Sequence, residues 1–100
     1  MYLIREVFKA KPGQASKLAK MFKKTMAPNM NGRIMTDMVG PYNTVVMEME
    51  VKSMADWEKS MNDYKSGKMM ETVSKEDMEA MSHYTDMYME GRREIYQILD

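Results

Sequence analysis

The stretch Thr44–Val51 constrains the fold more than any other, because its side chains alternate in the manner of a β-strand. One face is wholly apolar and consists of Val45, Met47, Met49 and Val51. The other face mixes two carboxylates with smaller side chains and consists of Thr44, Val46, Glu48 and Glu50. The apolar face requires cover from other elements, whereas the mixed face is either solvated or turned toward a polar interior.

Three further segments show the same alternation: residues 2–9, 33–39 and 92–99. Each of them carries bulky apolar side chains on both faces. Residues 40–43, Gly-Pro-Tyr-Asn, form a short link between the second and third strands, so these two strands are predicted to be an antiparallel hairpin.

Helical patterns occupy the two long intervals between the outer strands and the hairpin. A basic amphipathic helix is predicted from Pro12 to about residue 27. A second helix follows Ser53, whose hydroxyl is positioned to cap it, and is interrupted at residues 66–68. A third is predicted over about residues 69–90, with Ser74 as a possible second cap and Gly91 as its C′ residue.

The order strand, helix, strand, strand, broken helix, strand predicts an α+β, ferredoxin-like βαββαβ domain spanning residues 1–100. In that arrangement a four-stranded antiparallel sheet has the first and third strands at its centre, and its helices cover one face only. Because every strand is apolar on both sides, the second face is predicted to be covered by the same face of a second copy.

Composition excludes several classes of protein. The 15 basic and 15 acidic residues balance, and the predicted sheet lacks exposed aromatic pairs in basic surroundings, so nucleic acid is not an expected partner. Most of the basic residues precede residue 34, which predicts a basic helix packed beside acidic ones. No cysteine is present, and no apolar run approaches the roughly 20 residues of a membrane span, so a cytoplasmic protein is expected.

Methionine is the compositional anomaly, with 16 residues against three leucines. Thioethers bind Cu(I), and pairs such as Met35 with Met38 and Met78 with Met81 have suitably short spacings. Most methionines nevertheless occupy positions where leucine is expected on inward faces. We therefore interpret them as core-filling residues and predict no metal site.

Three stretches carry a resemblance to a known family: residues 2–13, the segment Asp-Met-Val-Gly-Pro-Tyr-Asn-Thr-Val-Val at 37–46, and Gly-Arg-Arg-Glu-Ile-Tyr at 91–96. Together they resemble the dimeric α/β-barrel superfamily, in particular its NIPSNAP-like and antibiotic-biosynthesis-monooxygenase-like members. The resemblance implies a homodimer whose two sheets face each other as a barrel. It does not fix an activity.

The resemblance gives no cofactor either. Haem-degrading members use an asparagine on the first strand together with tryptophan and histidine. Residues 2–9 contain no asparagine, so we carry over no haem site and expect no cofactor.

Four polar residues are weak candidates for a site: Arg5, Glu48, His83 and Tyr96. If the apolar face of Thr44–Val51 meets the helices, Glu48 points to the other side, where Arg5 is a possible neighbour. Either Arg93 or Glu94, and either Asp37 or Thr36, could join them, because a one-residue shift in register exchanges the faces. A partly buried Arg and Glu could orient an anionic or carbonyl-bearing ligand, or could simply be paired with each other. His83 could be a haem ligand, a general base or a partly exposed helix-surface residue.

Two functions remain open from the sequence. One is a small-molecule-binding homodimer for a hydrophobic or aromatic ligand, with its cavity either between helices and sheet or inside the barrel. The other is a cofactor-independent monooxygenase-like enzyme acting on an aromatic or polyketide-like substrate.

Overall fold

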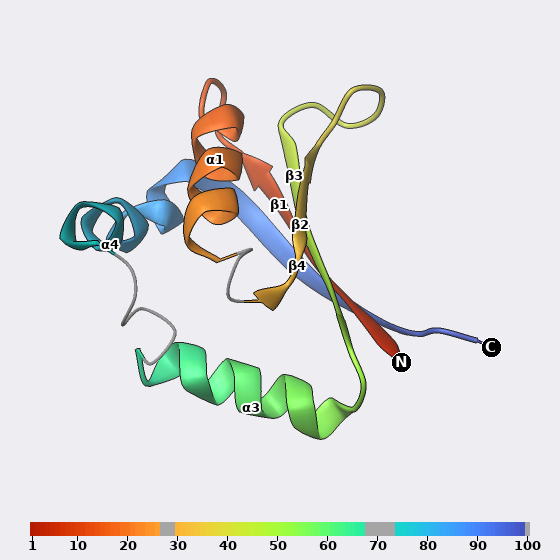
Figure 1. The fold of residues 1–100 in the computed structure, drawn as a ribbon. Helices are drawn as coiled ribbons and strands as arrows, with labels where there is room; N and C mark the ends of the chain where they lie inside the picture. Colours follow the sequence, from red (N-terminus) through yellow and green to blue (C-terminus); the bar gives the residue numbers. More distant parts are fainter. Residues whose placement is uncertain (27–29, 68–73, 100) are drawn as a thin grey trace.

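The computed structural model describes residues 1–26, 30–67 and 74–99 (Figure 1). Four antiparallel strands form one sheet in the order β2-β3-β1-β4. They are β1 (Tyr2–Ala10), β2 (Arg33–Thr36), β3 (Thr44–Val51) and β4 (Tyr88–Gln97). The described helices are α1 (Ala15–Thr25), α3 (Met54–Lys65), α4 (Lys75–Ser82) and the 3₁₀ helix η2 (Tyr84–Met87). The predicted ferredoxin-like fold is confirmed, with β1 and β3 at the centre.

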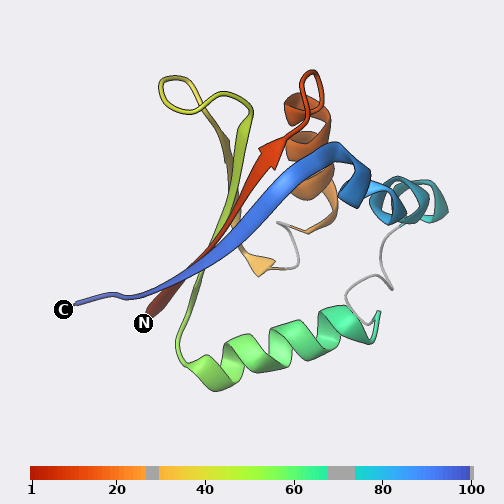
Figure 2. The same cartoon turned by 180° about the vertical axis from the view of Figure 1, so that it is seen from behind.

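All the described helices lie on one side of the sheet, as the two opposite views show (Figures 1 and 2). We call this the helix side and the other the open face. The strand pairing places Phe8 opposite Val45 and Glu6 opposite Met47, so these four side chains share the helix side. Val45 and Met47 are buried there against Leu18 and Phe22 of α1 and their neighbours. The predicted inward face of β3 is therefore correct.

The first helix is basic on its outer surface and apolar toward the sheet. Its buried residues are Leu18, Met21, Phe22 and Thr25. It begins at Ala15 with Gln14 as N-cap, so Pro12 lies in the preceding turn rather than in the first helical turn. The basic helix does contact an acidic one, because Lys24 Nζ lies 2.9 Å from Asp77 Oδ1 of α4. This ion pair matches the predicted packing of opposite charges.

The second strand is shorter than the sequence pattern suggested. It ends at Thr36, because the Asp37 carboxylate then accepts a hydrogen bond of 2.9 Å from the backbone N–H of Thr44 and closes the turn. Met38 and Val39, predicted as strand residues, are 96% and 98% exposed in the loop.

The prediction of a helix over about residues 69–90 is wrong at its C-terminal end. Residues 68–73 lie outside the described part of the chain, and Ser74 does cap α4, accepting a 3.1 Å hydrogen bond from Asp77 N–H. After η2, however, Tyr88 starts β4 and packs edge-on against Phe8 at 4.9 Å between ring centroids. Gly91 is consequently a mid-strand residue opposite Phe8, not a helix C′ residue.

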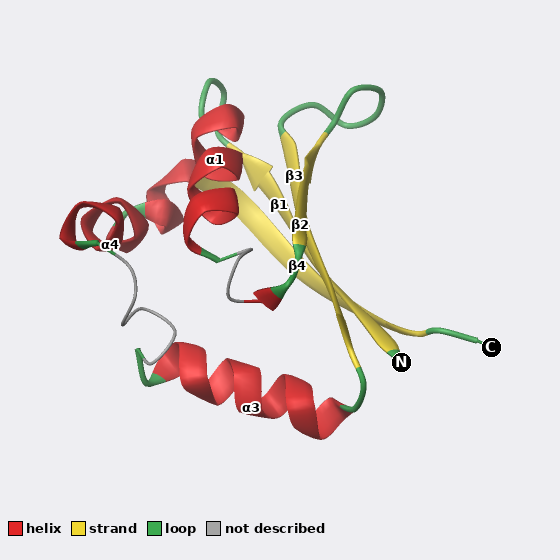
Figure 3. Ribbon diagram, in the orientation of Figure 1, coloured by secondary structure: helices red, strands yellow, loops and turns green. Residues whose placement is uncertain are grey.

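Helix α3 is the most loosely packed of the long elements. Ser53 caps it as predicted, with a 3.1 Å hydrogen bond from Asp56 N–H. None of its residues is buried, although the helix lies on the same side of the sheet as α1 and α4 (Figure 3). Its apolar residues, Met54, Trp57, Met61 and Tyr64, recur at helical spacing and are half-buried at best. A cavity between α3 and the sheet is the result.

Candidate functional site

A row of alternating charges crosses the open face at the middle of the sheet. The strand register aligns Arg33 of β2, Glu48 of β3, Arg5 of β1 and Glu94 of β4 side by side. Arg33 Nε and Nη2 both donate to Glu48 Oε1, at 3.0 and 2.7 Å. Arg5 Nε lies 2.9 Å from Glu48 Oε2, and Arg5 Nη1 lies 3.4 Å from Glu94 Oε1. Arg92 Nε donates to Glu94 Oε2 at 2.9 Å and ends the row.

The centre of this charge row is the best-shielded part. The side chain of Glu48 is 10% exposed, against 33% for Arg5 and 73% for Arg33. At the other end, the hydrogen bond from Arg92 is the main cause that lowers the pKa of Glu94 below its ordinary value. With three arginines and two glutamates, the row has an excess of one positive charge.

Two buried atoms of the row lack a hydrogen bond to the described residues: Arg5 Nε and Glu94 Oε1. Arg5 Nε is close to Glu48, but the two groups form an ion pair without hydrogen-bond alignment. A donor and an acceptor, both shielded from bulk water, are therefore available at the centre of the open face. Such groups are costly to leave unsatisfied, and they mark a place where a further polar group fits.

Two hollows flank the charge row on the open face. The larger, of about 770 Å³, has an apolar floor of Val7 and Val46 and is bordered by the β2–β3 loop at Pro41 and Tyr42. Its charged residues are Arg5, Lys9, Glu90 and Arg92. The smaller, of about 300 Å³, lies at Leu3, Asn31, Gly32, Arg33, Glu48, Met49 and Glu50. Both are shallow in a single chain and open to solvent.

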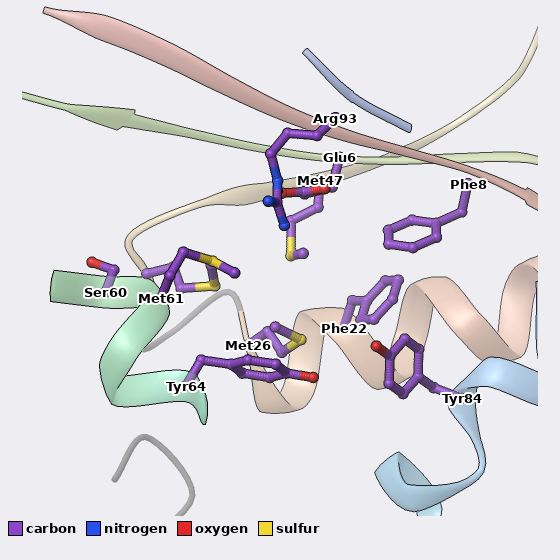
Figure 4. Close-up of a pocket in the computed structure, with 11 residues that line it drawn as sticks. Glu6, Phe8, Phe22, Met26, Met47, Ser60, Met61, Tyr64, Tyr84 and Arg93 are labelled. Carbon is purple, nitrogen blue, oxygen red and sulfur yellow. The ribbon is translucent and has the colours of Figure 1, made fainter. Parts of the chain in front are cut away.

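A separate cavity of about 80 Å³ lies on the helix side, between α1, α3 and the sheet (Figure 4). Four methionines and four aromatic residues form most of its wall. Its lining residues are Glu6, Phe8, Phe22, Met26, Met30, Met47, Ser60, Met61, Tyr64, Tyr84 and Arg93. The charges in this wall, Glu6 and Arg93, form an ion pair with each other.

The charged residues of this helix-side cavity come from β1 and β4, and a residue of α3 packs against them. The Arg93 guanidinium lies 5.0 Å from the ring centre of Trp57, which holds it by a cation–π contact. Burial, with a smaller contribution from the neighbouring Tyr64, raises the pKa of Tyr84 to about 12. The phenol of Tyr84 is therefore a neutral hydrogen-bonding group at neutral pH.

Comparison with known proteins shows which solved structures share this fold. No protein-family model and no curated protein matches the sequence. A NIPSNAP family protein of Agrobacterium tumefaciens superposes with a TM-score of 0.72, over 99% of this chain and 93% of its own, at 13% identity. A NIPSNAP domain protein of Burkholderia xenovorans gives a TM-score of 0.71 over 99% and 95%, at 9% identity. This chain shares the fold of these two NIPSNAP proteins.

The same fold extends to a Deinococcus radiodurans protein assigned provisionally as an antibiotic biosynthesis monooxygenase. It covers 100% of this chain and 94% of its own, with a TM-score of 0.67 and 7% identity. The resemblance read from the sequence is thus confirmed for the fold. Identities this low carry no activity from one NIPSNAP-fold protein to another.

On the NIPSNAP fold, three of the four sequence-predicted site residues come together. Arg5 and Glu48 are paired on the open face, and Tyr96 lies on the same face, where its interaction with Glu94 contributes to the lowered pKa of that carboxyl. Among the alternatives, Glu94 joins the charge row. His83 stands apart at the start of η2, with its side chain 66% exposed.

The other three alternatives do not join the row. Arg93 points to the helix side, Asp37 closes the hairpin turn, and Thr36 lies opposite Val45 in the register, on the helix side.

Sequence reasoning missed the helix-side pair of Glu6 and Arg93. One signal was available: Glu6 is the single charge on the β1 face that also carries Tyr2, Ile4 and Phe8. A lone carboxylate on an inward face requires a cationic partner on a neighbouring strand, and the last strand offers two consecutive arginines. The choice between them depended on the register, which places Arg93 opposite Glu6.

A metal-binding cluster and a membrane-spanning helix are both absent from the described residues. No group of three or more His, Cys, Asp or Glu in residues 1–26, 30–67 and 74–99 could hold a metal ion. Within the same ranges, no helix has the length and apolar character needed to cross a membrane.

Proposed function

We propose that this protein is a small-molecule-binding homodimer, in which two chains pair through their open faces and hold a small organic anion between the sheets. The proposal rests mainly on the charge row, whose two unsatisfied polar atoms lie at the centre of a face that the helices leave uncovered. Val7 and Val46 form an apolar floor beside the row. Pairing by a two-fold axis would shield both from water.

The chemistry of the larger hollow favours a carboxylate with an aromatic or aliphatic body. Arg5, Lys9 and Arg92 outnumber the single acid Glu90 at its border, and Arg5 Nε, although ion-paired with Glu48 at 2.9 Å, makes no aligned hydrogen bond. A carboxylate oxygen can accept from this donor, while the apolar part of the ligand covers Val7 and Val46. A volume of about 770 Å³ is within the range of pockets that hold such molecules.

The test measures both the mass of the protein in solution and its binding of an aromatic carboxylate. Light scattering after gel filtration is expected to give the mass of two chains, and an aromatic carboxylate such as benzoate or salicylate is expected to raise the melting temperature. At a ligand concentration ten times Kd the stabilisation is about 1.4 kcal/mol, or roughly 6–11 °C for a domain of this size. A benzyl alcohol control of similar shape without the charge is expected to give a much smaller shift.

A pair of charge-removing variants locates the binding site. Arg92→Gln, at the border of the larger hollow, is expected to abolish most of the carboxylate shift. Lys23→Gln removes one positive charge from the exposed surface of α1 on the helix side and is expected to leave it unchanged. A monomer in solution would refute the homodimer, and an equal loss in the two variants would refute this binding site.

A second function, a cofactor-independent monooxygenase-like enzyme, has one observation in its favour. The helix-side cavity combines an aromatic wall with the ion pair Glu6–Arg93 and the phenols of Tyr64 and Tyr84. Its volume of about 80 Å³, however, is well below the roughly 300 Å³ at which pockets for drug-sized molecules begin. Oxygen consumption with dihydroxy-aromatic substrates tests this function directly, and Glu6→Gln should abolish it.

The four sequence candidates do not support a monooxygenase as one constellation. Arg5, Glu48 and Tyr96 lie on the open face, while His83 is exposed at the start of η2. Under the proposed function, the first three belong to the interface between the sheets, and His83 has no role in it.

A further inference from the structure

The helix-side cavity has a second distinctive feature, which is its number of sulfur atoms. Met26 follows the last turn of α1, Met30 precedes β2, Met47 belongs to β3 and Met61 to α3. Three separate parts of the chain thus bring four thioethers to the same small space, because Met26 and Met30 belong to one stretch in which Met30 N–H donates a 3.1 Å hydrogen bond to the Met26 carbonyl oxygen. In Figure 4 the side chains of Met26, Met47 and Met61 all reach toward the centre of this space.

Core filling alone accounts poorly for this arrangement. Methionine is unbranched and flexible, so it normally adapts its shape to close irregular gaps in a core. Here four such side chains surround a gap of about 80 Å³ instead of closing it. Met47 and Met26 are only 3% and 8% exposed, so at least two of the sulfur-bearing side chains are shielded from bulk water.

The ligand chemistry favours one class of guest. Thioethers are neutral, soft ligands that select Cu(I), whereas hard cations require the clustered carboxylates that the described residues lack. Glu6 lies in the same wall with its side chain 13% exposed, and it supplies a negative charge near the sulfurs. Its partner Arg93 is 41% exposed and also contacts the ring of Trp57, at the border of the cavity.

We infer that the thioethers of Met26, Met30, Met47 and Met61 form a binding site for a soft monovalent cation, Cu(I) or its analogue Ag(I). The site is on the opposite side of the sheet from the charge row, so it does not depend on the proposed carboxylate binding. The short-spaced methionine pairs in the sequence are not its ligands as pairs. Met47 is separated from Met49 by one residue in the sequence, but only Met47 lines the cavity.

The test uses the intact protein with its methionine methyl groups labelled with ¹³C. Titration with Ag(I) is expected to shift four methyl resonances, those of the cavity methionines, and to saturate at one ion per chain. Cu(I) is then measured under anaerobic conditions by competition with a chromophoric chelator. Cu(II) and Zn(II), which prefer nitrogen and oxygen ligands, are expected not to bind at these residues.

Leucine variants separate the sulfur atom from its packing role. Met→Leu nearly conserves volume, so Met47→Leu and Met61→Leu are expected to stay folded and yet to weaken Ag(I) binding by about tenfold or more. Met21→Leu and Met81→Leu are the matched controls, since both residues are buried in the same core but do not line the cavity. These controls should bind Ag(I) like the wild type.

Three results would overturn the inference. They are an absence of Ag(I) binding, methyl shifts confined to exposed residues such as Met38, and equal losses of affinity in cavity and control variants. If Met47→Leu lowers the melting temperature too far to be measured, Met61→Leu on the loosely packed α3 still decides the question.

Discussion

Replacing Glu48 by leucine tests whether the charge row stabilises the monomer. Its carboxylate is shared by two guanidinium groups, with Arg33 on Oε1 and Arg5 on Oε2. The substitution removes both contacts at once and leaves two positive charges, on β1 and β2, facing each other across β3. Because Leu is similar in size to Glu, the backbone of β3 should stay in place, and the change in stability should report the lost electrostatic contacts.

The expected loss of stability depends on how far the two arginine side chains are exposed to water. Stripping one partner from a fully buried ion pair costs about 3–5 kcal/mol. Here the side chains of Arg5 and Arg33 are 33% and 73% exposed, so water replaces part of the lost interaction. The buried leucine also gains apolar contact, of roughly 1 kcal/mol. We therefore expect a net destabilisation of about 1.5 kcal/mol, which lowers the melting temperature by roughly 6–12 °C.

The assay is urea denaturation together with light scattering. Glu50→Leu is the matched control, because Glu50 is an exposed carboxylate two residues further along the open face, and its effect should stay within about 0.5 kcal/mol. If the charge of Glu48 is only structural, Glu48→Leu remains a dimer. A variant as stable as the wild type would refute the reasoning on the charge row, and monomers would show that Glu48 also holds the two chains together.

Three further predictions concern packing and titration. Gly91→Ala should destabilise the protein by about 1 kcal/mol in thermal melts, since a Cβ there would lie 3.2 Å from Cδ1 of the Phe8 ring. The hydrogen bond from Lys24 lowers the pKa of Asp77, so the stability advantage of wild type over Asp77→Asn should be present at neutral pH and vanish as pH falls below about 4. Because the pKa of Tyr84 is raised to about 12, its contribution to stability should be full below pH 10 and be lost from there toward pH 12; Tyr84→Phe should remove one late-titrating phenol from an ultraviolet titration.

Strand β3 could be predicted from the sequence because its alternation has no rival interpretation. Its bounds agree with the structure, and Val45, Met47 and Met49 of its inward face are buried, whereas Val51 is half-buried. Residues 88–90 were assigned wrongly because Tyr84 and Tyr88 are four apart, a spacing that fits a helix. The ring of Tyr88 instead packs on Phe8, a contact between residues 80 positions apart that no local pattern reveals. Gly91 was misassigned for the same reason. A glycine fits the C′ position of a helix, but here it lies in β4 opposite Phe8, where the aromatic ring leaves little room for a Cβ.

The charge row could be predicted only in part, for a related reason. Glu48 and Arg5 were expected to be neighbours, because the central position of two strands fixes which elements meet. Which residue β4 adds to the charge row, Glu94 or Arg93, depends on the register between β1 and β4, and the sequence does not give that register. The size of the helix-side cavity depends on how far α3 lies from the sheet, which is a tertiary property without a sequence signature.

The ion pairs of the two faces together provide a physical reason for the register of the sheet. Arg5 meets Glu48 and Glu94 on the open face, and the next residue, Glu6, meets Arg93 on the helix side. A slip of β4 by one residue would turn Glu94 toward the helix side and bring Arg92 or Arg93 into a different pairing, leaving a charge against the apolar core. An unpaired buried charge costs several kcal/mol. The apolar pattern of β4 is weak on both faces, so the alternating acids and bases disfavour that slip more strongly than the apolar side chains do.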